Sequence, residues 1–419
     1  MAGKYPVRVF KCSNEEYPRS LMAEWLEAVK KETSPPEMIF GETDIEGVRL
    51  DFNFGLRLQI PALGDDTLHV VIGNAESGEV YFDEEVSRVV LVSFEKYFLP
   101  WQVDIFYHGT QIFSHTFNPE GQEVFFKFPK TTIGDTIALL PYVDDFAKRW
   151  GCSARVLVPE SLREIAERSY PKLFFTDSMD KSTYATYYMN VWMDIYMPGA
   201  AHDGRMMPME QMGRAILGTP YTVCTAKFRP NKPRTIREPY VCIGVQASSP
   251  WKGWHYPGGW DAVVDYLKGA GYRVICIDRD YEVFDKELIM KIPEGAEDFT
   301  GNIPLTERIN LLAYAEFFIG LGSGLSWLAY AAGCPVVMIV GFTLPWFEFD
   351  TPYRVQNYLT CYGCFNDVRV DYKDVKNCPY HKNTDSQYEC SRLITPDQVI
   401  STLERLRRDL SRKGEFSQE

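Results

Sequence analysis

The sequence predicts an α/β protein with two doubly wound units, and three stretches carry that prediction. Ile303 to Gly341 reads as helix, buried strand, glycine turn, helix and second buried strand without a break. Tyr240 to Ile277 reads as strand, lysine-bearing loop, helix and strand. Thr131 to Thr176 alternates an amphipathic helix with short apolar strands. Alternating helices and buried strands of this kind are typical of parallel sheets covered by helices.

The segment before these units, residues 1 to 125, is expected to be a β-rich accessory domain. It shows short alternating stretches separated by Gly, Asp, Asn or Pro turns. Ser13 followed by Glu16 predicts a capping box for a helix through Val29. No cluster of histidines or carboxylates here points to chemistry, so we expect a binding or assembly module. The predicted strands are VRLDFNF, LRLQI, LHVVIG, VSRVVLVSF, WQVDIFYHG, QIFSHTF and EVFFKF.

The glycine turn Gly322, Ser323, Gly324 stands where a buried strand hands over to a helix. Free backbone N–H groups and the positive end of the helix then face the space above the sheet, which favours an anion such as a diphosphate. A tight turn without a ligand is the alternative. The loop Pro250 to Trp254 follows the first strand of the same unit, and Lys252 within it is placed to meet a phosphate. Trp254 suits stacking on adenine or a sugar, with core packing as the alternative.

The first unit opens with Thr132, Gly134 and Asp135 at the start of a helix that runs to Trp150. Asp135 is either a carboxylate favoured by the helix dipole or a group with a chemical role. In the second unit, Asp278 ends a strand, where an acid can accept a hydrogen bond from a ribose hydroxyl. The methionine-rich stretch from 184 to 212 is expected to form helices and loops near the cleft between the units.

Ten cysteines divide into isolated or core thiols and one spaced set. Cys361 and Cys364 are separated by two residues, and Cys378 and Cys390 follow at longer intervals with no other cysteine between. Four thiolates at such spacing predict a closed tetrahedral site for zinc or iron, structural because no position is left open for substrate. We expect the site to hold together an insert that has little core of its own.

The expected division of the chain follows from these elements and from the proline-bearing linker Pro230 to Pro239. It is 1-125, the β-rich accessory domain; 126-230, the first Rossmann-like, acceptor-side domain; 237-356, the second Rossmann-like, nucleotide-sugar domain; 357-392, the four-cysteine metal finger; and 393-419, a C-terminal helix.

Composition excludes several classes of function. A net charge of −13 argues against nucleic-acid binding, which needs a basic face. No run of eighteen apolar residues is present to span a membrane. The amino terminus lacks the apolar core of a signal peptide, so we expect the protein in the bacterial cytoplasm.

These motifs together resemble the GT-B heptosyltransferases. The Gly-Asp-x-x-x-x-x-Pro pattern of that family is matched by Gly134, Asp135 and Pro141, and its Lys-x-Trp pattern by Lys252 and Trp254. Its third pattern, Asp-Ser/Thr-Gly-Pro-x-His-Leu-Ala, is matched in part, because Gly322, Leu325 and Trp327 replace the Asp, Pro and His. These departures argue against a lipopolysaccharide-core acceptor.

The added β domain and the cysteine insert resemble a narrower group, the bacterial autotransporter heptosyltransferases. The resemblance implies inverting transfer of heptose from ADP-heptose to Ser or Thr hydroxyls of adhesin passenger domains, with no catalytic divalent metal. Asp135 matches the family's base, and Thr132, Gly134, Lys252, Trp254, Asp278, Gly322, Ser323 and Gly324 would bind the donor. The resemblance also implies one structural iron on Cys361, Cys364, Cys378 and Cys390, and a large homo-oligomer such as a dodecamer.

Two alternatives belong beside this interpretation. A lipopolysaccharide-type heptosyltransferase, or a transferase of another nucleotide sugar, would share the α/β units. A noncatalytic scaffold whose cysteine insert docks a partner would tolerate the loss of Asp135 and Lys252.

Overall fold

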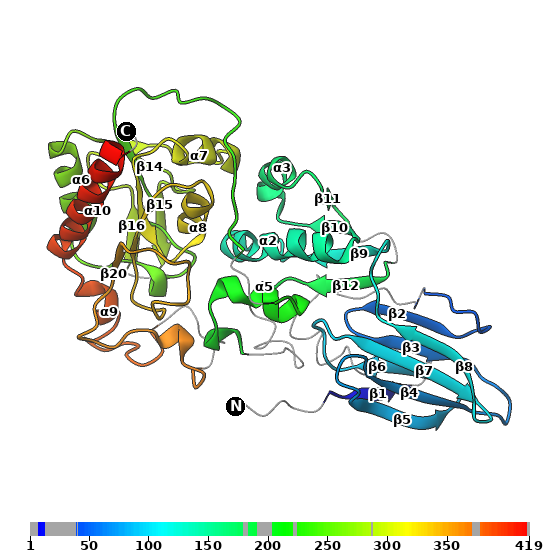
Figure 1. Ribbon diagram of the computed structural model, residues 1–419. Coiled ribbons are helices and arrows are strands. Elements are labelled where there is room, and N and C mark those ends of the chain that lie inside the picture. Colours follow the sequence, from blue (N-terminus) through cyan, green and yellow to red (C-terminus); the bar gives the residue numbers. More distant parts are fainter. Residues whose placement is uncertain are drawn as a thin grey trace.

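In the computed structural model, three parts of the chain lie next to one another: N-terminal strands, a first helix-covered sheet and a second helix-covered sheet (Figure 1). The structure describes residues 7–12, 39, 41–178, 183–190, 203–220, 224–285, 288–370 and 378–416, and the statements below concern these residues. The helix predicted between Ser13 and Val29 lies outside them.

An antiparallel sheet of the N-terminal part has the order β5-β4-β7-β8. Its inner face follows the alternation of the sequence: along β7, Trp101, Val103 and Ile105 are buried while the residues between them are partly exposed. Burial of these side chains drives the layer onto the rest of the molecule. The strands are β4 Leu68–Asn74, β5 Val80–Val86, β7 Trp101–Tyr107 and β8 Thr110–Thr116.

A longer sheet joins the N-terminal part to the first α/β unit, in the order β1-β6-β3-β2-β12-β9-β10-β11. Strand β12 pairs in parallel with β2 on one side and with β9 on the other, so antiparallel and parallel halves form one continuous sheet. The predicted boundary at residue 125 therefore falls inside β9 and does not separate two sheets. The strands are β1 Val9–Cys12, β2 Arg49–Asn53, β3 Arg57–Ile60, β6 Val89–Ser93, β9 Glu123–Lys127, β10 Ser153–Leu157, β11 Phe174–Phe175 and β12 Ala185–Tyr188.

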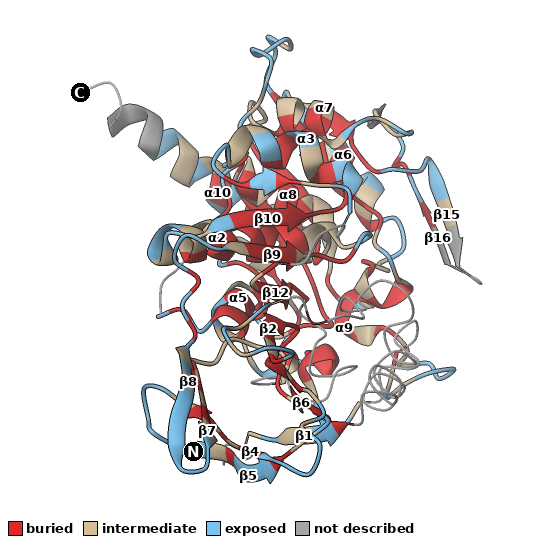
Figure 2. Cartoon of the chain, turned by 90° about the vertical axis from the view of Figure 1, so that its right-hand side faces the viewer, coloured by how far each residue is buried: buried red, intermediate tan, exposed pale blue. Residues whose placement is uncertain are grey.

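The helices of the first unit are α2 Ile133–Trp150, α3 Glu160–Ser169, the short η1 Gly204–Met206 and α5 Met209–Leu217. Helix α2 is buried along most of one face, from Thr136 to Phe146, and ends at Gly151, whose positive φ suits a left-handed cap. Buried residues fill the strands and the inner helix faces of this unit (Figure 2).

The second unit contains a parallel sheet in the order β17-β14-β13-β18-β19-β20. The chain order reverses between β13 and β18, and in open α/β sheets ligands bind in the crevice at this point. The strands are β13 Tyr240–Ile243, β14 Arg273–Cys276, β17 Glu297–Asp298, β18 Phe318–Leu321, β19 Val336–Ile339 and β20 Arg354–Val355, with a separate hairpin of β15 Glu282–Asp285 and β16 Leu288–Lys291.

The helices of this unit are η2 Pro250–Lys252, α6 Gly259–Gly269, α7 Leu305–Leu312 and α8 Gly324–Ala331. The cysteine segment that follows contains η3 Cys364–Asn366 and α9 Glu389–Arg392. Helix α10, Pro396–Phe416, then packs back beside α6 (Figure 1).

The predicted α/β class with a β-rich N-terminal domain is confirmed. Strands β5 and β12 are additional to the prediction, as are the short second-unit strands β15, β16, β17 and β20. Strand β5 exposes most of its acidic residues and buries only Phe82 and Val86, so its sequence resembles a polar turn. Strand β12 lies inside the methionine-rich stretch expected to be helices and loops, and it is buried on both faces between β2 and β9. A short strand covered on both faces gives no alternation to detect.

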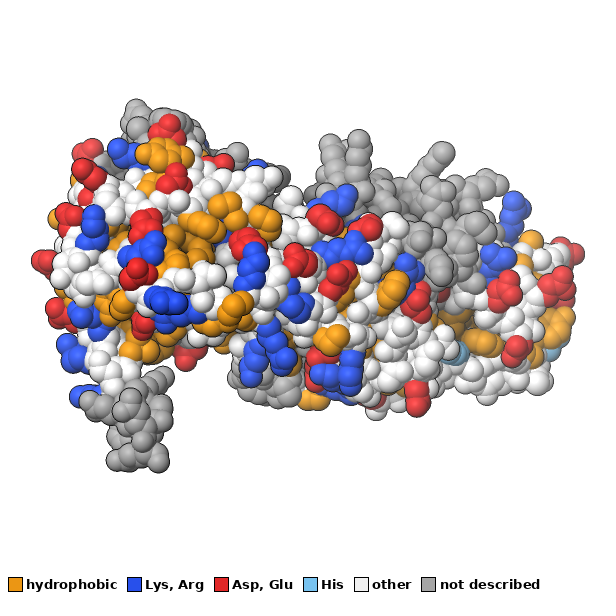
Figure 3. Space-filling view, turned by 90° about the horizontal axis from the view of Figure 1, so that it is seen from above, with side chains coloured by type: hydrophobic (Ala, Val, Ile, Leu, Met, Phe, Trp, Pro, Cys, Tyr) orange, Lys and Arg blue, Asp and Glu red, His pale blue; other side chains and the backbone are white. Residues whose placement is uncertain are grey.

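Two features of the described residues concern membranes and surface charge. Within the described ranges, no helix combines the length and the apolar character needed to cross a bilayer. On the face seen from above, basic and acidic side chains are interspersed over the described residues (Figure 3).

A buried ion pair in the N-terminal part of the long sheet allows a test of what stabilises this part of the fold. Arg57 donates to Asp51 through Nε at 2.7 Å and through Nη2 at 2.5 Å, and both side chains are at most 2% exposed. Arg57→Met should lower the thermal midpoint by an amount equivalent to about 3 kcal/mol, because it leaves Asp51 buried without its partner. Lys148→Met, which removes an exposed pair with Asp144, should change stability by less than about 1 kcal/mol. Equal midpoints for the two variants, measured by calorimetry, would contradict this assignment.

Candidate functional site

The candidate site forms where the first turns of α2 and α8 meet between the two α/β units. A Cβ atom added to Gly134 would lie 3.0 Å from Cδ1 of Trp327, and one added to Gly324 would lie 3.1 Å from Cβ of Ile133. Glycine at these positions therefore allows the two helix ends to approach closely. The predicted motifs Gly134-Asp135 and Gly322-Ser323-Gly324 are brought together although nearly half of the chain separates them.

Asp135 lies in the first turn of α2 and is partly buried. Burial raises the pKa of Asp135 to about 6, and the nearby ammonium of Lys252 opposes the shift. Among the described residues, its carboxylate accepts no hydrogen bond from another side chain. A carboxylate with a pKa close to neutrality and no side-chain hydrogen-bond donor among the described residues is suited to act as a general base.

Lys252 ends the short helix η2, and its Nζ lies 5.6 Å from the centre of the Phe342 ring. Burial lowers the pKa of Lys252, while the carboxylates of Asp135 and Glu348 raise it. The ammonium forms no hydrogen bond or ion pair within the described part of the chain. A partly buried cation in this state is available to an anionic ligand.

A cleft of about 1070 Å³ opens beside the helix ends. On the second unit it is lined by loops that follow the carboxyl ends of the parallel strands, including Gln246, Asp278 and Asn302, and by Ser323 and Gly324 of α8. The first unit contributes the entry to α2 and one side of α3. This is the position of the switch-point crevice, and the volume is ample for a nucleotide sugar. Asp135 and Lys252 are not among the residues that line it.

Two helix starts at the site carry no side-chain cap. Ser323 precedes α8 without capping it, which leaves N–H groups of the first turn for a ligand. Thr132 precedes α2, and its buried hydroxyl has no hydrogen-bond partner among the described residues. An orphaned buried hydroxyl is unfavourable unless a ligand or water satisfies it.

Asp278 borders the cleft, but its carboxylate already has protein partners. It accepts hydrogen bonds from the backbone N–H of Val245 at 2.7 Å and of Gln246 at 3.3 Å. Burial raises the pKa of Asp278 to about 6, and these bonds oppose the shift. The acid therefore joins the ends of β13 and β14, and its contact with a ribose stays a prediction.

Arg308 completes this corner from α7 and was not identified from the sequence. Its guanidinium is 3% exposed and donates to the carbonyls of Ile277 at 2.7 Å and Asp278 at 2.8 Å, and also to those of Gly301 and Ile303. One buried arginine thus fixes the loops that line the cleft on this side. A lone arginine in a helix gives no sequence signal for such a role.

Glu348 is a second residue that the sequence did not reveal. A Cβ added to Gly322 would lie 2.8 Å from Oε1 of Glu348, so this carboxylate occupies space that a larger residue at 322 would need. Glu348 accepts from the hydroxyl of Thr343 at 2.7 Å and from Arg354 at 2.8 Å. Gly322 replaces the Asp of the third pattern, and Glu348 supplies a carboxylate beside the same backbone position.

The tryptophans of the site are packing residues. The indole N–H of Trp254 donates to the carbonyl of Ile394 at 2.9 Å, and its ring is 5% exposed in the core of the second unit. Trp327 is 2% exposed and packs edge-on against Phe349. Contact of Trp254 with a donor stays a prediction, and the packing alternative fits its position better.

The four spaced cysteines approach one another in the segment after β20. Burial raises the pKa of Cys390 to about 12, and the neighbouring thiols of Cys361 and Cys378 raise it further. Burial and the thiol of Cys390 likewise raise the pKa of Cys364. Sulfur is the donor that zinc and iron prefer, so the donor set fits the predicted metals. In the described ranges, however, no three cysteine, histidine or carboxylate side chains are arranged as metal ligands.

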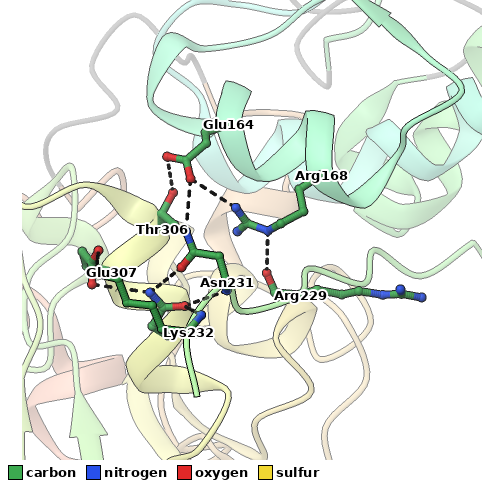
Figure 4. Close-up of polar contacts among 8 residues, drawn as sticks. Glu164, Arg168, Arg229, Asn231, Lys232, Thr306 and Glu307 are labelled. Carbon is green, nitrogen blue, oxygen red and sulfur yellow. Dashed lines mark hydrogen bonds and ion pairs between the residues drawn. The ribbon is translucent and has the colours of Figure 1, made fainter. Parts of the chain in front are cut away.

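A polar bridge connects the two units beside the cleft (Figure 4). Glu164 of α3 accepts from the hydroxyl of Thr306 on α7 at 2.9 Å and from Arg168 at 3.2 Å. The linker takes part through Asn231, whose amide reaches Glu164 at 3.4 Å, and through the ion pair of Lys232 with Glu307 at 2.5 Å. These contacts hold the first and second units in the arrangement that forms the site.

Two family models match the chain. Residues 45–109 match the N-terminal domain of glycosyltransferase TibC, and residues 209–367 match glycosyltransferase family 9, the heptosyltransferases. The first match covers N-terminal strands, and the second covers the turn, the lysine loop and the start of the cysteine segment with Cys361 and Cys364.

Relatives extend the similarity over nearly the whole chain. The autotransporter heptosyltransferase BAHTCr of Citrobacter rodentium is 38% identical over 91% of this chain and 94% of its own length. TibC of Escherichia coli is 38% identical over 88% of this chain and 92% of its own. The inactive autotransporter heptosyltransferase BimC of Burkholderia thailandensis is 32% identical over 88% of each chain.

The crystal structure of TibC, described as an iron-containing dodecameric glycosyltransferase, superposes on this chain with a TM-score of 0.85. It covers 90% of this chain and 100% of its own at 37% identity. A second TibC structure contains ADP-D-β-D-heptose. The extent and identity of these matches show that the chain belongs to the autotransporter heptosyltransferase family.

Proposed function

We propose that this protein transfers heptose from ADP-heptose to serine or threonine hydroxyls of an autotransporter passenger domain, with inversion at the anomeric carbon, in the bacterial cytoplasm. The observation that carries the proposal is the meeting of Asp135 and Lys252 beside the uncapped start of α8, in a chain of this family. Because the family includes a relative described as inactive, activity has to be argued from the site of this chain.

The reaction needs a base for the acceptor and a positive environment for the leaving group. The acceptor oxygen attacks the anomeric carbon, the bond from that carbon to the phosphate oxygen breaks, and Asp135 takes the hydroxyl proton. ADP leaves with its electron pair and gains negative charge. Lys252 and the N–H groups at the start of α8 stabilise that charge without a divalent cation.

Mass spectrometry of a Ser/Thr-rich passenger domain, incubated with the purified protein and ADP-heptose, tests the proposal. We expect stepwise gains of one heptose. Asp135→Asn should lower kcat by roughly 10²- to 10⁴-fold, because it keeps the shape of the side chain but cannot accept the proton. Lys252→Met should lower kcat by about 10²-fold and weaken ADP binding, because it removes the cation that meets the leaving group.

The other outcomes separate the alternatives. Transfer to lipopolysaccharide core but to no passenger would support the lipopolysaccharide-type enzyme. Transfer from another nucleotide sugar would keep the site but change the donor. Absence of transfer from every donor, with passenger binding retained in both variants, would support a noncatalytic scaffold.

The pH dependence should report the state of Asp135. Its pKa is about 6 and the base form is active, so kcat/KM should rise as pH increases through about 6 and then level off. The Lys252 ammonium lowers the pKa of Asp135, so Lys252→Met should move this midpoint to higher pH. An unshifted midpoint in that variant would contradict the proposed pairing.

The cysteine segment is proposed to hold one structural iron, with zinc as the alternative, on Cys361, Cys364, Cys378 and Cys390. The iron of TibC and the chemistry of the four thiols support this assignment. Bound metal would stabilise the segment and neutralise thiolates that otherwise repel one another. The protein is also proposed to form a large homo-oligomer, for which dodecameric TibC is the precedent.

Elemental analysis of the purified protein tests the metal assignment. We expect about one iron or zinc per chain, and Cys361→Ser and Cys390→Ser should each lower this content and the thermal midpoint. Cys152→Ser is the control, because Cys152 lies in the first unit at the end of α2. Equal metal content in all of these proteins would contradict the assignment.

A further inference from the structure

The lysine loop and the cysteine segment are joined by a buried hydrogen bond that neither motif predicts. The indole N–H of Trp251 donates to Sγ of Cys364 at 3.1 Å, and both residues are less than 9% exposed. Trp251 immediately precedes Lys252 in the short helix η2. The Trp251 side chain in this turn therefore contacts the cysteine segment, while the ammonium of the next residue interacts electrostatically with Asp135.

Aromatic packing strengthens the same connection. The ring of Trp251 lies 5.7 Å from that of Phe342 and 6.3 Å from that of Phe365, the residue after Cys364. Phe342 is also the ring near which the Lys252 ammonium lies. The Phe342 ring thus lies beside both Trp251 and the Lys252 ammonium.

A second contact ties the other end of the loop to the same segment. Nε2 of His255 lies 2.6 Å from the carbonyl of Pro250, and its ring lies 4.8 Å from that of Tyr388, which precedes α9. A Cβ added to Gly253 would lie 2.6 Å from the His255 ring, so the loop has no spare room between these contacts. The loop that carries Lys252 is therefore held by contacts with the cysteine segment as well as by the sheet of its own unit.

We propose that Trp251 is a positioning residue for Lys252, and that through its bond to Cys364 the cysteine segment sets how Lys252 meets the diphosphate. This inference rests on the proposed donor role of Lys252. It means that the cysteine segment influences donor binding and does not only stabilise its own structure. Trp251 itself need not contact the substrate.

Calorimetric measurement of ADP binding to the full chain tests the inference with a matched pair of variants. Trp251→Phe keeps an aromatic ring and removes the N–H group, and we expect ADP to bind about tenfold more weakly. Tyr240→Phe removes a buried hydrogen bond of the second unit away from the site, from the Tyr240 hydroxyl at the start of β13 to the Leu311 carbonyl at 2.6 Å, and should change ADP affinity less than about twofold. Thermal midpoints of both variants check that folding is retained.

The pH profile provides a readout that general loss of packing would not move. Lys252 faces two carboxylates, Asp135 and Glu348, and a displaced ammonium would lower the pKa of Asp135 less. Trp251→Phe should therefore shift the midpoint of kcat/KM upward, in the same direction as Lys252→Met, whereas Tyr240→Phe should not.

The outcomes distinguish this inference from the proposed function. If the wild-type protein binds ADP and Trp251→Phe binds it as tightly, with an unshifted pH midpoint, the positioning role is overturned and the donor site stands. If the wild-type protein does not bind ADP, the donor site itself is overturned, and the positioning role with it.

Discussion

The site depends on how closely the starts of α2 and α8 approach. Gly134 and Gly324 leave only hydrogen atoms where any side chain would meet Trp327 or Ile133. Each glycine costs conformational entropy on folding, because the unfolded chain is more flexible at glycine than at other residues. In return, the folded state brings two positive helix ends next to each other. The carboxylate of Asp135 and the ammonium of Lys252 come within electrostatic range because the helix starts meet.

Charge around this point is balanced by residues from separate parts of the chain. Helix ends and Lys252 attract an anion, while the carboxylates of Asp135 and Glu348 partly offset the positive charge of Lys252. Glu348 is itself held by Thr343 and Arg354, so it stays in place when a ligand arrives. This preorganisation is what electrostatic stabilisation of a leaving group requires, because the dipoles and charges need not reorient during the reaction.

Sequence reasoning located the parts of the site that lie within local motifs. Asp135, Lys252 and the Gly322 to Gly324 turn follow from the alternation of helices and strands, because parallel strands bring their carboxyl ends to one edge. Glu348 and Arg308 could not be found in this way, since their roles depend on backbone atoms distant in sequence. Trp254 shows a further limit: a loop sequence does not determine which of its two indoles faces the core and which faces the cysteine segment.

The fold class was predictable from the sequence, but the pairing of strands across the domain boundary was not. The division at residue 125 followed a change from alternating strands to helices, but β12 crosses it by pairing with β2 and β9. The pairing of one strand with two strands distant in the chain produces no pattern in the sequence of any of the three.

That continuous sheet also joins strands β1, β2, β3 and β6 to the strands next to α2. Opening of the cleft would separate the two α/β units at the linker, while the N-terminal strands and α2 would travel together as one rigid body. Strands β1, β2, β3 and β6 would therefore keep a fixed distance to Asp135 while the second unit moved away.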